Sequence, residues 1–395
     1  MAQKKTGLAI ILLCLAVLGL ILGLQAALNI SPFNPSAYNT YTHQALAWRA
    51  GHAYLSQDIP HLELAIYQGR YYVSFPPVPS LPIYLLTFVF GANVPDGLLV
   101  MAYALLATLV LFRYLARRGF APFAAAGWAF LSLFASSLLP LVLQGAVWYQ
   151  AQVLGLLLII LALERLDAGQ PLMGLICYAL SVGCRPFNAL YGPLLLYLYA
   201  RPRLAGGTRP YDLFRQLLPG LTAGLLIAGL YAWYNILRFG NPLEFGHNHL
   251  PEFSFQGGQQ FALAHLGKNA QQYLLGLPFA RSGAGLALKP FGFSLFLANP
   301  LLLLLVIWGT ALALKGGLNM ERGLILLFFA LHLLLLLLHR TFGGYQFGAR
   351  YAVDLLPYAL LFLARRARPS CTKAEAAVML AGLAFSIYGS LMVHI

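Results

Sequence analysis

Apolar segments of helix-spanning length alternate with short basic segments along almost the whole chain. The apolar runs recur from residue 7 to the C-terminus. A hydrocarbon core about 30 Å thick requires roughly 20 apolar residues in a helix, and lipid satisfies no backbone hydrogen bonds, so these runs must be helical. The pattern predicts an all-α, polytopic integral membrane protein in which eleven to thirteen transmembrane helices form a single membrane domain over residues 1–395.

The composition agrees with a membrane protein and changes how the charge is interpreted. The chain is 60% hydrophobic and 9% charged. A net charge of +14 would suggest nucleic-acid binding in a soluble protein, but here the basic residues cluster at the ends of apolar segments, where they set orientation. The first apolar run, residues 7–29, is followed by no small-residue cleavage site, so we expect a retained anchor.

The basic clusters predict the orientation. The positive-inside rule assigns them to the cytoplasm, and with them the N-terminus; they are Lys4, Lys5, Arg113, Arg117, Arg118, Arg201, Arg203, Arg209, Lys315, Arg322, Arg365, Arg366, Arg368 and Lys373. Two long segments are then predicted outside, residues 30–77 and 239–291, with shorter outer turns near 140–148, 184–190 and 340–350.

Residues 78–112 allow two interpretations, because Asn93-Val94-Pro95-Asp96-Gly97 interrupts the apolar run. Two short helices would put Arg113 to Arg118 outside. One long kinked crossing would keep them in the cytoplasm. The sequence leaves both open, which is why the number of spans is given as a range.

The first outer loop, residues 30–77, is predicted to be ordered. After Ser36 as a potential N-cap, an amphipathic stripe runs to Gly51 through Tyr38, Tyr41, Ala45 and Trp48 and predicts a helix lying in the membrane interface. The stretches Leu62–Tyr67 and Arg70–Phe75 flank Gln68-Gly69, which predicts a hairpin with a two-residue turn. Four prolines between 76 and 82 return the chain to the bilayer.

These features together resemble the C-type (GT-C) membrane glycosyltransferase superfamily. The resemblance rests on the order of a first span, an outer loop with an interfacial helix, an acid before Tyr67-Gln68-Gly69-Arg70-Tyr71-Tyr72, and a proline-rich re-entry. Later segments resemble the group that includes the rhizobial lipopolysaccharide galacturonosyltransferase-like domain and protein O-mannosyltransferase-like bacterial membrane proteins; they are Cys184-Arg185-Pro186, residues 234–246 and residues 344–351. The resemblance covers roughly residues 1–365.

The resemblance implies transfer of a sugar, a hexosyl or pentosyl group, from a polyprenyl-phosphate carrier. The acceptor would be a glycan, lipid or protein at the outer face of a bacterial cytoplasmic membrane, in cell-envelope assembly. The superfamily places a base or metal ligand among the acids of the first outer loop. In this chain the stretch Asn39–Gln44, where relatives carry an Asp, contains no acid.

The chemistry of such a transfer selects a short list of residues. A base must take the proton of the acceptor hydroxyl while an anomeric carbon with oxocarbenium character is attacked. Glu63 is the candidate base, with Asp58 and His43 behind it. The alternatives are that Glu63 only caps or pairs within the hairpin and that Asp58 is a turn residue.

The leaving phosphate needs cations on the same side of the membrane. Arg185 lies within a long apolar stretch, where an arginine is costly and therefore suggests function, although it could instead snorkel to outer headgroups. Arg350 could contact the phosphate or pair with Asp354, and Arg70 could reach the site or be solvated. The predicted substrate-binding set also includes Tyr71, Tyr72, Asn188 and Gln346.

The second long outer segment contains Glu244, His247 and His249. In an extended strand, alternate residues share a face and His-x-His could hold a metal, whereas a helix would point the two histidines apart. Acceptor or phosphate binding and a purely structural loop are the other interpretations. A divalent metal is compatible with the sequence and not required by it, so no metal ligand is assigned. No P-loop or dinucleotide motif suggests a soluble nucleotide-sugar donor.

Two other function classes remain open at this stage. A transporter or flippase of a lipid-linked saccharide would use Arg185, Glu63 and Arg350 to line a pathway, with its site near the middle of the membrane. A non-catalytic relative acting in envelope assembly would account for the missing acid near Asn39. Few ionisable residues fall within the predicted spans, which favours a site at the outer face and hence an enzyme.

Overall fold

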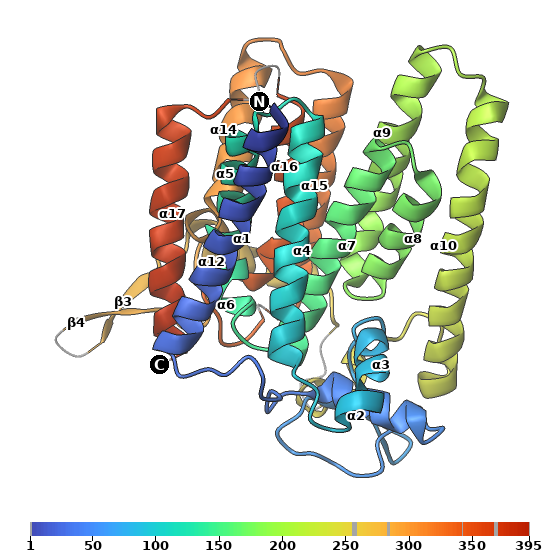
Figure 1. Ribbon diagram of the computed structural model, residues 1–395. Coiled ribbons are helices and arrows are strands. Elements are labelled where there is room, and N and C mark those ends of the chain that lie inside the picture. The colour runs from blue at the N-terminus through green and yellow to red at the C-terminus, as the bar shows by residue number, and fades with distance from the viewer. Residues whose placement is uncertain (1, 255–258, 283–284, 342, 367–369, 395) are drawn as a thin grey trace. The chain divides into compact units, whose positions relative to one another are not determined.

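The computed structural model describes residues 2–254, 259–282, 285–341, 343–366 and 370–394. Over these residues the chain is mainly helical, with two two-stranded hairpins (Figure 1). It divides into two compact units: the first-loop unit comprises Ser31–Ala104 and Gln144–Gln260, and the C-terminal unit comprises Met1–Ile30, Leu105–Leu143 and Phe261–Ile395. The single membrane domain expected over 1–395 stays a prediction.

Six helices of the described chain are long and apolar enough to cross a membrane. They are α1 (Ala2–Ala27), α4 (Asp96–Arg117), α7 (Val147–Asp167), α10 (Pro210–Phe239), α15 (Met320–Leu338) and α17 (Lys373–Met392). Four shorter apolar helices accompany them: α3 (Ser80–Phe90), α5 (Pro122–Phe134), α8 (Pro171–Val182) and α14 (Pro300–Leu314). The polytopic helical fold is confirmed; the count of eleven to thirteen spans stays a prediction.

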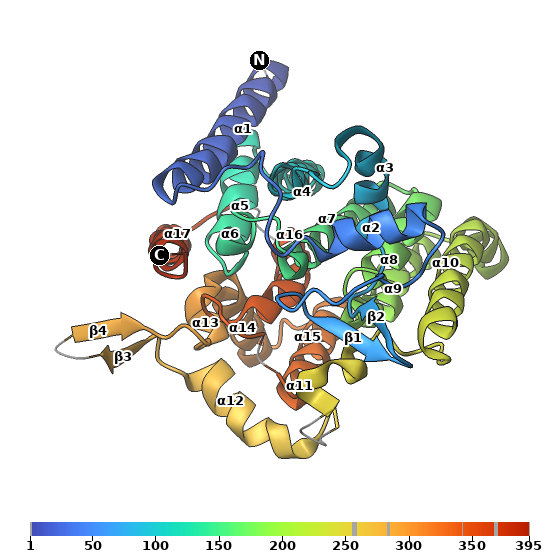
Figure 2. The ribbon, with the colours of Figure 1, turned by 90° about the horizontal axis from the view of Figure 1, so that it is seen from below.

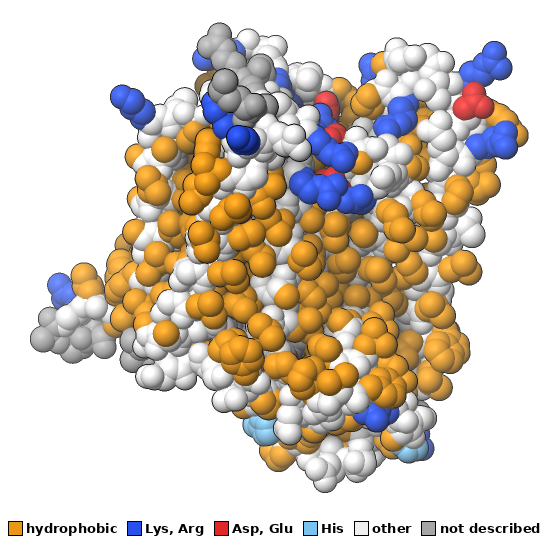
Figure 3. Space-filling model, in the orientation of Figure 1, with side chains coloured by type: hydrophobic (Ala, Val, Ile, Leu, Met, Phe, Trp, Pro, Cys, Tyr) orange, Lys and Arg blue, Asp and Glu red, His pale blue; other side chains and the backbone are white. Residues whose placement is uncertain are grey.

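Several of these helices present apolar side chains outward. Leu15 on α1 and Leu225, Leu226 and Trp233 on α10 are each more than 60% exposed. In Figure 3 hydrophobic side chains run along α1 and α10, while Lys and Arg side chains gather at helix ends. Apolar faces of this extent require lipid or another protein surface, so they support membrane insertion of each unit.

The interrupted segment 78–118 contains a short helix followed by one crossing. At 1.5 Å per residue the 11 residues of α3 span about 16 Å, too little for a bilayer. The 22 residues of α4 span about 33 Å. Of the two helices only α4 has the length of a crossing, which favours a single crossing between Asp96 and Arg113; the number of crossings in this segment stays a prediction. Arg368 of the basic clusters lies outside the described residues.

The first outer loop forms α2 and a hairpin (Figure 2). Helix α2 (Thr40–Arg49) lies across the ends of α7 and α10, and strands β1 (Leu64–Tyr67) and β2 (Arg70–Val73) pair antiparallel beside it. Gln68 and Gly69 form the turn with φ of 49° and 73°, the paired positive values of a tight hairpin. The predicted N-cap is wrong: α2 begins after Asn39, because the amide and hydroxyl of Ser36 are engaged elsewhere.

The remaining elements of the first-loop unit follow α7 and α8. Residues 183–190 turn the chain through η1 (Pro186–Leu190) into α9 (Tyr191–Ala205), and α10 then ends at Gly240 in the left-handed region with φ of 68°. The short elements η2 (His247–His249) and α11 (Pro251–Ser254) follow. The predicted outer segment 239–291 is thus shared between the two units, and its residues 255–258 and 283–284 lie outside the described part.

The C-terminal unit is held by buried polar anchors between helices. The fully buried Asn299, at the start of α14, accepts from the Ser137 amide at 2.9 Å and donates to its hydroxyl at 3.2 Å. Arg365 pairs with Glu321 on α15 and donates to the Tyr114 hydroxyl at 2.8 Å. Its other elements are α6 (Leu138–Leu141), η3 (Leu263–His265), α12 (Leu266–Leu275), β3 (Phe279–Ser282), β4 (Gly285–Leu288), α13 (Leu295–Ala298), η4 (Arg350–Leu355) and α16 (Leu356–Ala364).

Candidate active site

Glu63, the candidate base, is half-buried and is fixed by α7. Its Oε2 accepts a hydrogen bond of 2.8 Å from the indole Nε1 of Trp148. Its contact with the hairpin uses the main chain, because the Ser74 hydroxyl donates to the Glu63 carbonyl oxygen at 2.8 Å. Among the described residues Oε1 has no hydrogen-bond partner. The carboxylate is thus oriented by one neutral donor and keeps one oxygen free to take a proton.

The position of Trp148 is itself determined by the first outer loop. The Val147 amide, at the start of α7, donates to the Tyr38 carbonyl oxygen at 3.0 Å. The Tyr38 ring packs against the Trp148 ring at a centroid distance of 4.9 Å and against His61 at 6.3 Å. A tryptophan at the end of an apolar span is typical of an interface belt or of packing. The structure makes it the side chain that positions Glu63.

A buried carboxylate that sequence reasoning passed over, Asp96, supports this arrangement. It begins α4, is 1% exposed, and its Oδ1 accepts from the Ser36 amide at 2.9 Å. It lies against Gly145, where an ideal Cβ would come within 2.3 Å of Oδ1. Asp96 therefore ties the beginning of the first outer loop to the turn before α7. An acid in the first turn of an apolar helix was the signal that could have identified it.

Arg185 lies in the turn between α8 and η1, next to α2. It packs on α7 at Gly155, where an added Cβ would meet the arginine Cγ at 3.1 Å. Burial raises the pKa of the Tyr41 hydroxyl well above its ordinary value, Cys184 adds to this, and the charge of Arg185 acts in the opposite direction. Tyr41 in turn packs in one core cluster with Leu62 and Leu64, the two neighbours of Glu63. Both neighbours of Glu63 in the chain thus pack with Tyr41, and the charge of Arg185 acts on that same tyrosine.

Other predicted residues near this turn hold the backbone. Asn188 is 3% exposed, and its Nδ2 donates to the Ser181 carbonyl oxygen at 3.3 Å, at the end of α8. The side-chain amide of Asn188 thus already makes a hydrogen bond within the protein. Its role in substrate binding stays a prediction.

A second cation, Arg238 near the end of α10, is buried beneath the hairpin. It is 2% exposed and donates from Nη1 to the Val73 carbonyl oxygen and from Nη2 to Asn235 Oδ1, both at 2.8 Å. Its guanidinium lies over the rings of Tyr234 and Phe239, at 4.2 and 4.7 Å. No acid within ion-pair distance accompanies it in the described part of the chain. The sequence contained Arg238 in a family-like segment without assigning it a role.

We expect Arg238→Met to loosen the hairpin. Loss of two buried hydrogen bonds, with the Val73 and Asn235 acceptors left unpaired, costs about 1–3 kcal/mol for each such group. The measurement is the apparent unfolding temperature in detergent, together with the rate of proteolysis within residues 60–75. Arg70→Met removes an exposed cation from the same hairpin and is the matched control; equal changes in both variants would contradict an anchoring role for Arg238.

A hydrogen-bond network joins the same end of α10 to α2 and α3. The Tyr234 hydroxyl accepts from Gln44 Nε2 and from Trp48 Nε1, both at 3.0 Å. Gln44 Oε1 accepts from the Ser80 hydroxyl at 2.6 Å. Gln44, at the end of the acid-free stretch Asn39–Gln44, therefore serves as a buried connector between helices.

The hairpin residues of the predicted substrate-binding set divide into two groups. Tyr72 is 4% exposed and packs on Phe239 at 5.2 Å, so it belongs to the core between hairpin and α10. Tyr71 is half-buried, and its carbonyl oxygen accepts from the Leu55 amide at 2.8 Å. Arg70 is exposed, with its guanidinium 4.5 Å from the centre of the Tyr54 ring.

The two candidates behind Glu63 also differ. Asp58 is exposed, and its carboxylate has no hydrogen-bond or ion-pair partner among the described residues. His43 on α2 is half-buried; burial, and then the nearby His61, lower the pKa of its imidazole, so the neutral ring is favoured. His43 faces a cavity of the first outer loop and remains the better supported of the two.

His247 and His249 belong to the short 3₁₀ helix η2, which follows Glu244, so the extended strand required for a His-x-His metal site is not formed. His247 packs on Phe253 at 4.8 Å, whereas His249 packs on Tyr67 at 4.7 Å. Glu244 is used locally, because Oε1 accepts from the Gly246 amide and Oε2 from Asn248. Within the described ranges no group of three or more His, Cys, Asp or Glu side chains could hold a metal ion.

Arg350 and Gln346 lie in the C-terminal unit. Arg350 is 7% exposed, its amide donates to Gln346 Oε1 at 2.8 Å, and its guanidinium lies 5.4 Å from the Tyr351 ring centre. Gln346 is 3% exposed and caps the start of η4 in this way. Since Glu63 and Arg185 belong to the first-loop unit, participation of Arg350 and Gln346 in one site with them stays a prediction.

Comparison with known proteins gives a match at the level of structure alone. No family model and no curated protein matches the chain. The archaeal oligosaccharyltransferase AglB from Archaeoglobus fulgidus, solved with an inhibitory peptide and a dolichol-phosphate, matches with a TM-score of 0.53 and 14% identity, over 98% of this chain and 55% of that one. ArnT from Cupriavidus metallidurans, solved with undecaprenyl phosphate, gives 0.48 and 14%, over 93% and 63%.

A structural match at an identity this low shows the fold alone, so the activity has to be argued from the site. The chain spans little more than half the length of AglB and under two thirds of ArnT. The particular subgroups that the sequence resembles stay predictions. In its polytopic helical fold the chain is similar to AglB, in agreement with the C-type (GT-C) membrane glycosyltransferase architecture that its sequence resembles.

Proposed function

We propose that the protein transfers a sugar from a polyprenyl-phosphate carrier to an acceptor at the outer face of a bacterial cytoplasmic membrane, with its N-terminus in the cytoplasm. The observation that carries the proposal lies in the first-loop unit. There, Glu63 is an oriented carboxylate next to residues that pack with Tyr41, and Arg185 is a cation near Tyr41 that follows, by two residues, a glycine in contact with the groove residue Tyr231.

The groove suits the hydrocarbon part of a lipid carrier. It lies between α8, α9 and α10, has a volume of about 320 Å³, and is lined by Leu, Val, Ala and Gly with two tyrosines. Both tyrosine hydroxyls are already bound to backbone carbonyl oxygens, Tyr178 to Ala189 at 2.8 Å and Tyr231 to Ala179 at 3.1 Å. Tyr231 packs directly on Gly183, two residues before Arg185. An isoprenoid chain in the groove would therefore bring its phosphate toward the guanidinium.

The residues can carry out the transfer as an inverting displacement. The acceptor hydroxyl oxygen bonds to the anomeric carbon while the bond from that carbon to the phosphate oxygen breaks. The hydroxyl proton passes to Glu63, and the leaving polyprenyl phosphate takes the bonding electron pair. Arg185 stabilises the negative charge that remains on the phosphate. No group of three or more His, Cys, Asp or Glu side chains among the described residues could hold a divalent metal, and the transfer as proposed uses Glu63 and Arg185.

A transporter or flippase of a lipid-linked saccharide is the alternative. It requires polar groups near the middle of the membrane that open alternately to both sides. Glu63 and Trp148 instead lie where the first outer loop meets the beginning of α7, and Arg185 lies in a turn between two helices. This position supports an enzyme with its site at one end of the helices. A non-catalytic relative would show no transfer from any donor.

The experiment is transfer by purified protein in lipid from a panel of polyprenyl-phosphate sugars. We expect Arg185→Ala to raise KM for the donor about tenfold or more, because a lost contact to the phosphate weakens donor binding. Ala228→Phe narrows the groove and should weaken long-chain donors more than short-chain ones. Gly229→Phe, at the neighbouring position with open space around it, is the control.

Two results would overturn the proposal. No transfer from any donor, with lipid-linked sugar still bound, would favour the flippase or the non-catalytic relative. Transfer that is unaffected by both Arg185→Ala and Ala228→Phe would separate the activity from the groove.

A further inference from the structure

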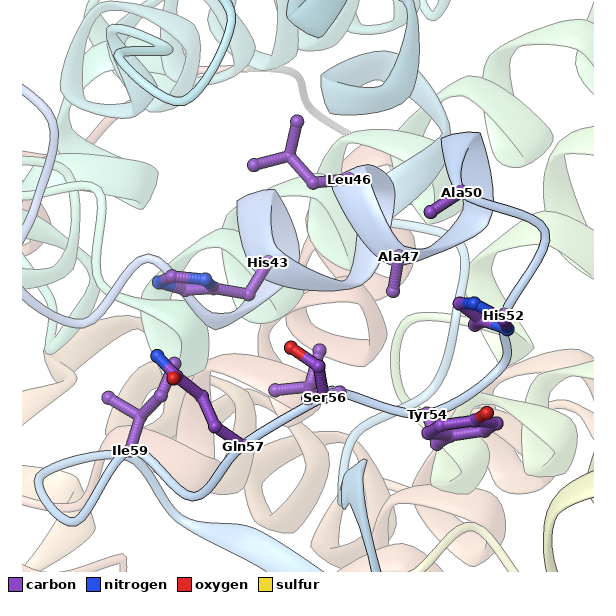
Figure 4. A pocket seen from close by; sticks show the side chains of 10 residues that line it. His43, Leu46, Ala47, Ala50, His52, Tyr54, Ser56, Gln57 and Ile59 are labelled. Atoms are coloured by element: carbon purple, nitrogen blue, oxygen red, sulfur yellow. The ribbon is translucent and has the colours of Figure 1, made fainter.

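A cavity of about 240 Å³ lies on the side of α2 that faces residues 52–59 (Figure 4). One wall is formed by α2, including His43 and Ala47, and the other by the loop that follows, including Tyr54 and Gln57. In Figure 4 the His43 ring and the Gln57 side chain face each other across the gap, and Ser56 points toward α2. None of the residues of the groove at Arg185 contributes to it.

The lining combines neutral hydrogen-bonding groups with apolar and aromatic surface. The polar groups are two imidazoles, one amide and two hydroxyls, from His43, His52, Gln57, Ser56 and Tyr54, and no lining residue is Asp, Glu, Lys or Arg. Each of these groups can both donate and accept a hydrogen bond, as an amide, a hydroxyl and a neutral imidazole do. The lining therefore suits a ligand with many hydroxyls and no charge.

Both walls are held in place without a ligand. The His52 amide donates to the Ala47 carbonyl oxygen at 2.9 Å, and the Leu55 amide donates to the Tyr71 carbonyl oxygen at 2.8 Å. The Tyr54 ring lies 5.0 Å from the His52 ring and 4.5 Å from the Arg70 guanidinium. A cavity whose walls are fixed in advance loses little conformational entropy when a ligand enters.

We propose that this cavity binds one ring of a neutral saccharide, and that it is the acceptor subsite of the transferase. The volume lies just below the range of about 300–1,000 Å³ found for drug-sized ligands, which matches a single sugar ring. The polar side chains can bond its hydroxyls while Tyr54 packs on its C–H face. The donor phosphate needs a cation, which this lining lacks. Only the assignment as acceptor subsite rests on the proposed function; the binding itself does not.

The test is direct binding of methyl glycosides of neutral hexoses and pentoses to the purified full chain, followed by saturation-transfer NMR. We expect binding by at least one glycoside, reduced about tenfold or more in Gln57→Ala and in Ala50→Trp, which adds bulk to the lining. Asn93→Ala likewise removes a carboxamide and Ala92→Trp makes the same change as Ala50→Trp, both at exposed positions that do not line the cavity, and they should leave binding intact.

Each outcome bears on the proposal. Binding that is equal in Gln57→Ala and Asn93→Ala, or in Ala50→Trp and Ala92→Trp, would place the ligand elsewhere. No binding by any neutral glycoside to wild type would overturn the subsite even if transfer activity is present. If glycosides bind as expected and no donor supports transfer, the saccharide site stands and only its role as acceptor subsite fails.

Discussion

Replacing Glu63 by glutamine should reduce transfer by a factor of a hundred or more, which corresponds to about 3 kcal/mol of activation free energy. The substitution keeps the size of the side chain and leaves an amide oxygen that can still accept the bond from Trp148 Nε1. It removes the ability to take a proton from the acceptor hydroxyl. The expected loss therefore lies in kcat, with little change in KM for the donor. The measurement is steady-state transfer with the best donor of the panel.

Two comparisons make this result specific. Trp148→Phe keeps the aromatic packing with Tyr38 and removes the donor to Glu63, so we expect a smaller loss that changes the pH profile of kcat. Asp58→Asn changes an exposed carboxylate in the same loop and should have a minor effect. Transfer that survives Glu63→Gln but falls with His43→Ala or Asp58→Asn would move the base to that residue.

Local patterns predicted the elements of the first outer loop well. Gly69 predicts the hairpin turn because glycine adopts positive φ at no steric cost, whereas Gln68, with φ of 49°, is brought to an uncommon positive φ by the pairing of the strands. The apolar runs predicted the helices for a similarly general reason, since lipid leaves a backbone no other choice. Such rules need no knowledge of the partner that a residue meets in the fold.

Long-range partners account for what the sequence did not reveal. Ser36 fits an N-cap by type, but its amide is taken by Asp96, sixty positions away along the chain. Trp148 resembles an interface tryptophan until Glu63, separated from it by 85 positions, accepts its indole hydrogen. Glu244 looked available for a ligand, yet both of its oxygens are used within its own turn. The long-range contacts of Ser36 and Trp148 depend on the tertiary fold and leave no periodic signal in the sequence.

The difference between general rules and contacts set by the tertiary fold also explains why the sequence indicated Arg185 and not Arg238. A lone arginine in an apolar stretch drew attention to Arg185 because its cost in lipid is general. Arg238 lies near a helix end, where basic residues are common, so its burial beneath the hairpin could not be inferred from position. One arginine is thus a candidate for phosphate and the other holds the loop that carries Glu63.

Gly145→Ala should be the most damaging small substitution in the first-loop unit. An ideal Cβ at this position would lie 2.3 Å from Asp96 Oδ1 and 2.6 Å from the Asp96 main-chain carbon. The side chain cannot simply rotate away, because the backbone at the start of α4 is also in the way. Overpacking of this kind costs about 1–3 kcal/mol, occasionally more. We expect a lower apparent unfolding temperature in detergent and loss of most transfer activity.

The loss of activity follows from what Gly145 and Asp96 hold together. If α4 and the turn before α7 are forced apart, the Ser36 amide loses its acceptor and the bond from Val147 to Tyr38 shifts, so Trp148 no longer holds Glu63 in place. Gly229→Ala on α10 is the matched control, because its Cβ would meet nothing within 4 Å and alanine favours a helix. If Gly145→Ala is as stable and active as Gly229→Ala, then Asp96 does not position the site, and the orientation of Glu63 must come from the hairpin alone.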